Sequence, residues 1–455
     1  MFLESLKDIL NELEGLIYWP WLILILFGTG ILLTLRTRFI QVRRMGTAFR
    51  LIFRGALGKD DFRQKKGDIS PFQALSTALA ATVGLGNIAG VATAVAWGGP
   101  GAVFWMWMTA LCGMATIYAE SILAIKYRSV AEDGSMAGGP MYYLSKGVKS
   151  RGLGRSMALV FALTGSVACL LGTGNMMQSN SIATSFQTSF GIPFWSSGLI
   201  ISVLTGMVTI GGIKRIGIVA EKLVPSMIFI YIGVAMVILL VNISEIPAKL
   251  WLIVQCAFDP SAAGGGALGM SMIMAMKFGV SRGILSNEAG LGSSPIAHGA
   301  AKEEDPDRQG ILAMNGVFID TIVVCTMTAL VILLAGDWTS GEEPTDIVAT
   351  AFESVIPHGH YIVAVCALLF GFSTLLGWSY YGEQCIQYLL GIRVVKFYRY
   401  MFVLLVFCGA VIKVEVVFSI GTISNAFMAM PNLIGLIILS GVVADIATHK
   451  IKKDS

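Results

Sequence analysis

The chain has 455 residues, of which 55% are hydrophobic and 13% are charged. Soluble domains carry about 25% charged residues, so this composition excludes a water-soluble protein and indicates a membrane protein. The formal net charge of +4 is small, and we expect no nucleic-acid partner. The 7 cysteines lie almost wholly in apolar runs without metal-ligand spacing, so we expect them to pack as small hydrophobic residues.

About eleven apolar runs follow one another along the chain, most of them near the length of about 20 residues that a membrane-spanning helix needs. The first run, 16–35, follows an acidic segment, which predicts a retained span rather than a signal peptide. The others lie near 70–97, 101–127, 156–186, 194–212, 216–242, 262–298, 311–335, 360–390, 397–412 and 416–446. The prediction is an all-α polytopic membrane protein.

Every second loop between these runs is basic. Loops 36–69 and 126–155 are rich in Lys and Arg, whereas loops 187–193 and 336–360 contain neither. Basic residues mark cytoplasmic loops, so we expect the N-terminus outside and the C-terminus in the cytoplasm. The expected location is the plasma or inner membrane.

We divide the chain into an N-terminal span with its basic loop (1–69), a first five-helix repeat (70–242), and a second five-helix repeat with a short cytoplasmic tail (243–455). Because five is odd, the second repeat would lie upside down relative to the first. Many secondary transporters have this inverted arrangement, with a ligand site at mid-membrane between broken helices.

Gly84, Gly86 and Gly90 cluster around Asn87 near the middle of the second run. Glycine costs about 1 kcal/mol relative to alanine inside a helix, so the cluster favours a break. A break within the membrane frees peptide groups, which must then face a cavity or a ligand. The alternative is a close-packing face, because Gly86 and Gly90 have the GxxxG spacing.

Such a break would leave both donors and acceptors without partners. We expect the freed N–H groups of Leu85 and Gly86 to bind a carboxylate at a half-helix N-terminus. Freed carbonyls near Ala80 and Val83 would suit a hard cation such as Na⁺.

The seventh run is too long and too polar to be one plain span. We expect its break, the counterpart of the first, at Gly279, Ser281 and Gly283. Ile273 and Phe278 would then form an apolar wall beside the substrate.

Several motifs resemble those of a known family. The stretch 98–113 (GGPGAVFWMWMTALCG) resembles the signature of the sodium:alanine, or alanine or glycine:cation, symporters, and the similarity continues through 137–143 (AGGPMYY) and 286–294 (SNEAGLGSS). The segment 83–87 (VGLGN), followed by 98–104, is also similar to the first helix of the neurotransmitter:sodium symporters. Both families belong to the amino-acid–polyamine–cation superfamily, which implies a five-plus-five inverted fold with broken first and sixth core helices.

The resemblance implies Na⁺-driven import of alanine, glycine or similar small amino acids. Carried over by position, it implies that the substrate carboxylate meets Leu85 and Gly86. It implies one cation site formed by four residues: Ala80, Val83, Ser373 and Thr374. Ala81 stands where the neurotransmitter symporters have an asparagine that helps to hold a second Na⁺, so we expect one coupled Na⁺.

Polar and aromatic side chains at three places within the spans each have two possible roles. Gln178 would bind the substrate amino group or form an interhelical hydrogen bond. Asp320, a lone carboxylate in mid-span, would pair structurally or serve gating or proton coupling. Trp378 and its neighbours would border the site or belong to an interfacial belt. The expected substrate site comprises Thr82, Gly84, Leu85, Gly86, Asn87, Gln178, Ile273, Phe278 and Gly279.

The predicted function is a sodium-coupled symporter that imports small neutral amino acids by alternating access. Its expected partners are the amino acid, Na⁺ as the coupling ion, and the lipid bilayer, with no enzymatic cofactor and no obligate protein partner. A proton-coupled transporter of the same fold is the alternative, and a channel is less favoured. The sequence lacks the GxxxxGK[ST], HExxH and GxSxG motifs, which argues against an ATP-driven pump and against an enzyme.

Overall fold

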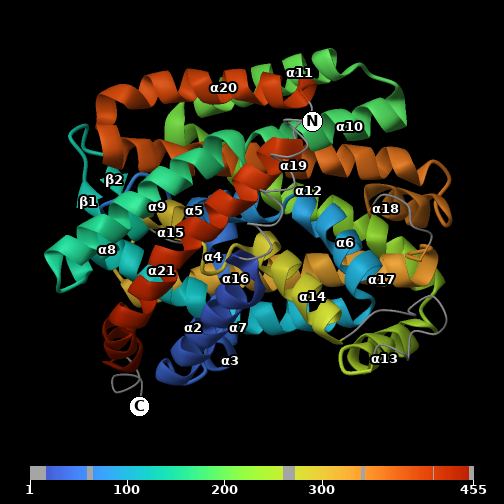
Figure 1. Ribbon diagram of the computed structural model, residues 1–455, viewed down its shortest axis with the longest axis horizontal. Coiled ribbons are helices and arrows are strands. Elements are labelled where there is room, and N and C mark those ends of the chain that lie inside the picture. Colours follow the sequence, from blue (N-terminus) through green and yellow to red (C-terminus); the bar gives the residue numbers. More distant parts are fainter. Residues whose placement is uncertain (1–16, 59–64, 260–271, 340–343, 413–414, 450–455) are drawn as a thin grey trace.

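The computed structural model describes residues 17–58, 65–259, 272–339, 344–412 and 415–449. Within these ranges the chain is almost wholly helical (Figure 1). The two short strands found there, β1 (Ser129–Val130) and β2 (Met136–Ala137), pair antiparallel in the loop after α7.

The helices follow the predicted apolar runs closely. In the first half of the chain they are η1 (Tyr18–Leu22), α2 (Ile23–Arg36), α3 (Ile40–Arg43), α4 (Met45–Ala56), α5 (Pro71–Thr82), η2 (Leu85–Asn87), α6 (Ala89–Gly98), α7 (Gly101–Tyr127), α8 (Pro140–Gly147), α9 (Arg151–Leu171), α10 (Met176–Phe190), α11 (Phe194–Thr209) and α12 (Gly212–Val241). In the second half they are α13 (Ile246–Cys256), α14 (Met272–Asn287), α15 (Ser294–Gly299), α16 (Pro306–Val317), η5 (Phe318–Cys325), α17 (Thr326–Ala335), α18 (Pro344–Glu353), α19 (Gly359–Leu390), η6 (Ile392–Val394), α20 (Val395–Val411) and α21 (Glu415–His449).

Seven helices within the described ranges are long and apolar enough to cross a bilayer. The pair α5 and α6 passes the same criterion as one span that is bent by 59°. The shorter apolar helices include Pro20–Arg36 and Phe194–Thr209. The all-α polytopic architecture is therefore confirmed, and the predicted break in the second run is present.

The broken span α5–α6 lies in the middle of the bundle. Helix α5 begins at a capping box, in which the Ser70 hydroxyl accepts from the Gln73 N–H at 3.1 Å and the Gln73 side chain accepts from the Ser70 N–H at 3.0 Å. Pro71 occupies the first helical position, where no N–H is needed. Helices α12, α15, α16 and α19 surround α5, and residues 74–82 are all buried.

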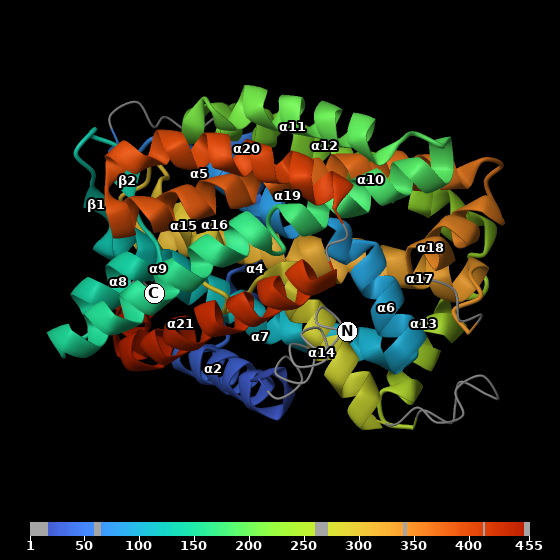
Figure 2. The same ribbon diagram turned by 45° about the horizontal axis from the view of Figure 1, so that its top comes forward.

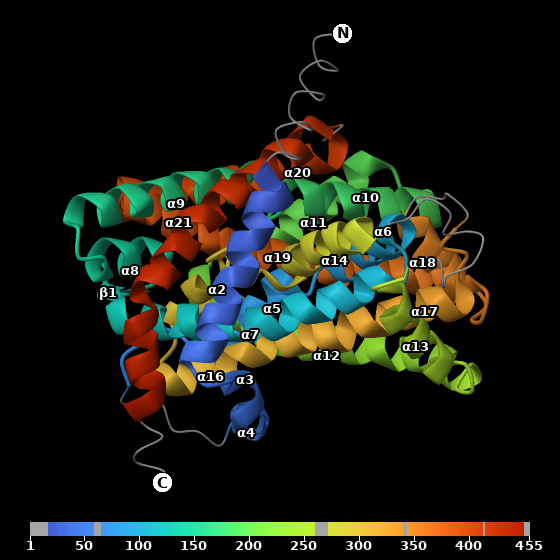
Figure 3. The same ribbon diagram turned by 60° about the horizontal axis from the view of Figure 1, so that its bottom comes forward.

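Other helices form the periphery of the bundle. Helices α11 and α20 lie side by side along one edge (Figures 1 and 2). The N-terminal helix α2 packs across α7 and α21 (Figure 3).

The break in the seventh run is not where the glycines predicted it. Helix α14 continues through Gly279 and Gly283 without interruption. These residues are small because α14 packs closely against α7: a Cβ on Gly279 would lie 2.2 Å from the Ala102 carbonyl oxygen, and one on Gly283 would lie 2.3 Å from the Thr109 hydroxyl. The two glycines therefore serve helix packing.

The break in this run follows α14, at 288–293. Glu288, Gly290 and Gly292 have φ values of 56°, 88° and 82°, a left-handed conformation that no helix continues. The chain resumes as α15 at Ser294.

A third break, which the hydropathy did not predict, interrupts the run 156–186. Helix α9 ends at Leu171 and α10 begins at Met176. Gly172 allows a close approach of α21, since its Cβ would lie 2.5 Å from the Cα atom of Gly421. Of the four residues between the helices, Thr173 lines the cavity that the other two breaks also border.

Candidate functional site

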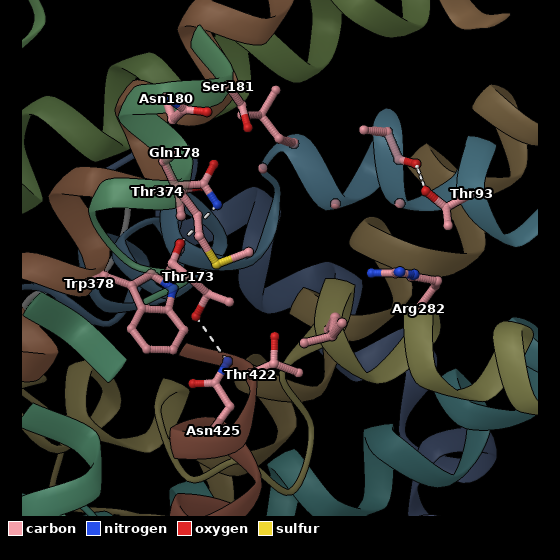
Figure 4. A pocket seen from close by; sticks show the side chains of 18 of the residues that line it. Thr93, Thr173, Gln178, Asn180, Ser181, Arg282, Thr374, Trp378, Thr422 and Asn425 are labelled. Carbon is pink, nitrogen blue, oxygen red and sulfur yellow. Dashed lines mark hydrogen bonds between the residues drawn. The ribbon is translucent and has the colours of Figure 1, made fainter. Parts of the chain in front are cut away.

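The three breaks border one cavity of about 900 Å³. Its lining comes from α5–α6, α9–α10, the end of α14 with the break after it, α19, the end of α20 and the start of α21. Figure 4 shows Gln178, Thr374 and Trp378 on one side and Arg282 on the other. Among the charged residues that the structure describes, Arg282 and Glu288 line this cavity.

The structure brings together part of the predicted substrate site. Five of its residues line the cavity: Thr82, Gly84, Leu85, Gly86 and Gln178. The other four do not: Asn87, Ile273, Phe278 and Gly279.

The expected apolar wall is not formed by the residues that we predicted for it. The Ile273 side chain is 57% exposed, and the Phe278 ring packs edge-on against Trp97 at 5.5 Å. Because the break lies after α14, the apolar residues of this span that line the cavity are instead Leu285 and Leu291.

The α5–α6 break presents peptide groups to the cavity. Helix α5 ends at Thr82, and Val83 leaves helical geometry with ψ 88°. Leu85 and Gly86 open the short helix η2, and the first N–H groups of a helix have no acceptor within it. Both residues line the cavity.

The alternative of a close-packing glycine face is not supported. A Cβ on Gly90 would have no heavy atom within 4 Å, and one on Gly86 would come no closer than 3.6 Å to Ser286. Both residues line the cavity, and neither brings a neighbouring helix into close approach.

The hydroxyl pair on α19 lies against the same break. Ser373 and Thr374 both donate to the Phe370 carbonyl, at 2.8 and 3.0 Å, and the Ser373 hydroxyl is 3.4 Å from the Val83 carbonyl. Ala80 lies in the last turn of α5, where helix carbonyls have no intrahelical donor. The arrangement collects hydroxyl and carbonyl oxygens, the ligands of a hard cation.

Asn87 faces away from the cavity. Its amide oxygen accepts from the Gly84 N–H at 2.8 Å, and its amide nitrogen donates to the Asp320 carboxylate at 2.7 Å. Asp320 is fully buried and also accepts from Ser286 and Thr321, each at 2.7 Å. Asp320 therefore has structural hydrogen-bond partners, as in the first of its two interpretations. Through Asn87 it connects the α5–α6 break to η5 on the side away from the cavity.

Two amide side chains that contact the third break, Gln178 of α10 and Asn425 of α21, line the cavity. The Gln178 amide nitrogen donates to the Thr173 carbonyl at 3.0 Å, and that of Asn425 donates to the Thr173 hydroxyl at 2.9 Å (Figure 4). Among the described residues, the amide oxygens of Gln178 and Asn425 have no hydrogen-bond partner. Both oxygens are buried acceptors in residues that line the cavity.

The sequence resembles characterised transporters over almost its whole length. It matches the model of the sodium:alanine symporter family over residues 3–454. It is 46% identical to the sodium/alanine symporter AgcS of Methanococcus maripaludis, with 96% of this chain and 95% of that protein covered. It is 38% identical to the probable sodium/glutamine symporter GlnT of Bacillus subtilis (97% and 90% covered). It is 36% identical to the putative sodium/proton-dependent alanine carrier YrbD of the same species (96% and 90% covered).

The fold is similar to that of a solved transporter, MhsT in complex with L-phenylalanine. The TM-score is 0.54 at 12% sequence identity, over 84% of this chain and 99% of that one. At this identity the likeness concerns the fold alone, and it agrees with a polytopic bundle containing broken helices. The chain therefore belongs to the sodium:alanine symporter family, whose members are cation-coupled amino-acid symporters rather than enzymes.

Proposed function

We propose that this protein imports small neutral amino acids, alanine and glycine in particular, in symport with Na⁺ across the plasma or inner membrane. The observation that carries the proposal is the α5–α6 break, whose residues Leu85 and Gly86 line the cavity while the Val83 carbonyl lies 3.4 Å from the Ser373 hydroxyl of α19. One break thus offers a site for a carboxylate and a site for a cation.

The substrate would bind between the first and third breaks. The amides of Leu85 and Gly86 receive its carboxylate, as helix N-termini bind anions without any basic side chain. The unpartnered amide oxygens of Gln178 and Asn425 accept from its ammonium group. Thr82 and Gly84 complete the wall beside them.

Na⁺ would bind at Ala80, Val83, Ser373 and Thr374. Each Na⁺ that enters under a potential of about 100 mV supplies about 2.3 kcal/mol. Because about 1.4 kcal/mol corresponds to a factor of ten, one Na⁺ suffices for more than tenfold accumulation of substrate.

The cavity opens toward the side with few basic residues. Exposed residues at its mouth are Trp97, Phe194 and Ile412, and each lies beside a loop that the positive-inside pattern places outside. The buried helix α5 closes the opposite side. This arrangement supports an outward-open state, with a cytoplasmic C-terminus, as one half of an alternating-access cycle.

Uptake by proteoliposomes tests the proposal. We expect saturable accumulation of radiolabelled alanine when a Na⁺ gradient points inward, and loss of accumulation when the gradient is abolished. Accumulation driven by a proton gradient without Na⁺ would instead favour proton coupling, as in the description of the relative YrbD as a putative sodium/proton-dependent carrier. Absence of alanine uptake under both gradients would contradict the proposed substrate.

A further inference from the structure

Glu288 lies in the wall of the cavity, at the start of the break after α14. It lines the cavity although its side chain is only 3% exposed. One carboxylate oxygen accepts from the Trp378 indole N–H at 2.8 Å, and the other accepts from the Ser293 hydroxyl at 2.5 Å. The proposed transport mechanism uses neither the carboxylate nor these two hydrogen bonds.

The Trp378 indole is held from two sides. Glu288 holds its N–H, and the third break lies behind it, because a Cβ on Gly174 would come within 2.6 Å of three Trp378 atoms. The side chain is 2% exposed and lines the cavity beside Gln178 and Thr173 (Figure 4). An indole fixed in this way occupies space that a larger ligand would need.

Trp378 also belongs to the helix face that carries the cation-site hydroxyl. Thr374 and Trp378 are four residues apart on α19 and both line the cavity, as residues one turn apart do. The orientation of the indole therefore defines the cavity wall directly beside Thr374.

The backbone that carries Glu288 is itself fixed from outside the cavity. The Asn432 amide nitrogen on α21 donates to the Gly290 carbonyl at 2.9 Å and to the Glu120 carboxylate of α7 at 2.5 Å. The Asn287 amide oxygen accepts from the Ala289 N–H at 3.0 Å. A carboxylate mounted on this backbone has a defined position from which to orient the indole.

We propose that Glu288 is a positioning residue that limits the size of the transported side chain by fixing the Trp378 indole in the cavity wall. The proposal rests on the proposed function, binding of a small amino acid at the α5–α6 break. Without the acceptor, the indole N–H loses its buried partner, and the ring keeps only its packing against Gly174 and can tilt away from the cavity. The cavity then admits larger aliphatic and aromatic amino acids.

Equilibrium binding of radiolabelled alanine to the purified protein in Na⁺, with glycine, leucine and phenylalanine as competitors, tests this proposal. Glu288→Leu and Trp378→Phe each remove one end of the hydrogen bond. We expect each variant to raise the affinity for phenylalanine relative to alanine by about tenfold, within the range that pocket shape supplies. The double variant should change that ratio no more than either single variant does.

Two further variants separate positioning from other roles. Glu288→Gln keeps an acceptor for the indole N–H, so its ratio should stay within about threefold of that of the native protein. Trp107→Phe removes a comparable hydrogen bond, from the indole to Thr326 at 2.8 Å, at a site that does not line the cavity, and it should leave the ratio unchanged.

The outcomes are distinct. A native ratio in Glu288→Leu, or in Trp378→Phe if the first variant does not fold, would overturn the proposal. If Glu288→Gln loses as much alanine binding as Glu288→Leu does, the proposal is also overturned. The negative charge of Glu288, rather than its hydrogen bond to the indole, would then be what alanine binding requires. Failure of the native protein to bind alanine would instead contradict the proposed function.

Discussion

At the scale of single residues, Gly84 sets the distance between the broken helix and α19. A Cβ at this position would lie 2.4 Å from the Thr374 hydroxyl oxygen. We expect Gly84→Ala to displace that hydroxyl from the proposed cation site and to raise the Na⁺ concentration for half-maximal alanine binding by about tenfold, the loss of roughly one hydrogen-bond-sized interaction. Titration of alanine binding with Na⁺ measures the shift.

The matched control is Gly233→Ala on α12, where an added Cβ would meet no atom within 4 Å. This variant should keep the native Na⁺ dependence. A native Na⁺ dependence in Gly84→Ala as well would mean that Thr374 does not bind the cation.

For Asn87, the sequence predicted the local backbone structure but not the contacts of the side chain. Its place between glycines predicted a break, and the break is present. Its side chain, however, caps Gly84 and pairs with Asp320, 233 positions away, and no local pattern reveals a partner so distant in sequence. Gln178, by contrast, does line the cavity, because it follows a break that we did not predict.

Removal of the Asn87 amide should therefore act on stability. Asn87→Ala leaves the Gly84 N–H and one Asp320 oxygen without a partner in a buried setting, and we expect a loss of about 1–3 kcal/mol of folding free energy. Thermal unfolding in detergent checks this against Asn242→Ala, whose amide donates only to a carbonyl of its own helix, at 2.9 Å. Equal stability of the two variants would show that the network contributes nothing specific.

At the scale of elements, glycine clusters predicted a break in two helices, but they have a different structural role in each. In the second run it accompanies a break, whereas in α14 it permits contact with α7. The two uses look alike in sequence, because both place small residues within an apolar run. The break that we missed, between α9 and α10, contains Gly172, Gly174 and Asn175, which repeat the spacing of Gly84, Gly86 and Asn87. The signal was therefore present in the sequence, but the run that contains it was taken as one continuous span.

A single substitution distinguishes packing from flexibility in α14. Because a Cβ on Gly279 would lie 2.2 Å from a backbone oxygen of α7, Gly279→Ala should destabilise the protein by more than the typical cost of about 1 kcal/mol for a point mutation. Gly152→Ala in α9, where nothing lies within 4 Å, serves as the control in the same unfolding assay. A Gly279→Ala variant that is as stable as the native protein but has altered transport would show that Gly279 serves backbone flexibility rather than packing.

At the scale of the whole molecule, the all-α membrane architecture could be predicted, because a bilayer requires long apolar helices whatever their packing. About eleven spans were expected, and the described residues contain seven helices long and apolar enough to cross a bilayer, or eight with the bent α5–α6 pair, beside shorter apolar helices. The division at 1–69, 70–242 and 243–455 stays a prediction, as does the orientation of the termini. Contacts between helices that are distant in sequence, such as those of α14 with α7 and of α9 with α21, depend on side-chain shape that no single run encodes.

The central claim is that peptide groups of one broken helix bind both solutes, so that Na⁺ and amino acid stabilise each other. The most direct test is alanine affinity measured as a function of Na⁺ concentration in the native protein and in the Ser373→Ala/Thr374→Val double variant. We predict that Na⁺ increases alanine affinity in the native protein, and that the variant needs at least about tenfold more Na⁺ for the same effect. An alanine affinity that is independent of Na⁺, or the same Na⁺ dependence in both proteins, would contradict the account.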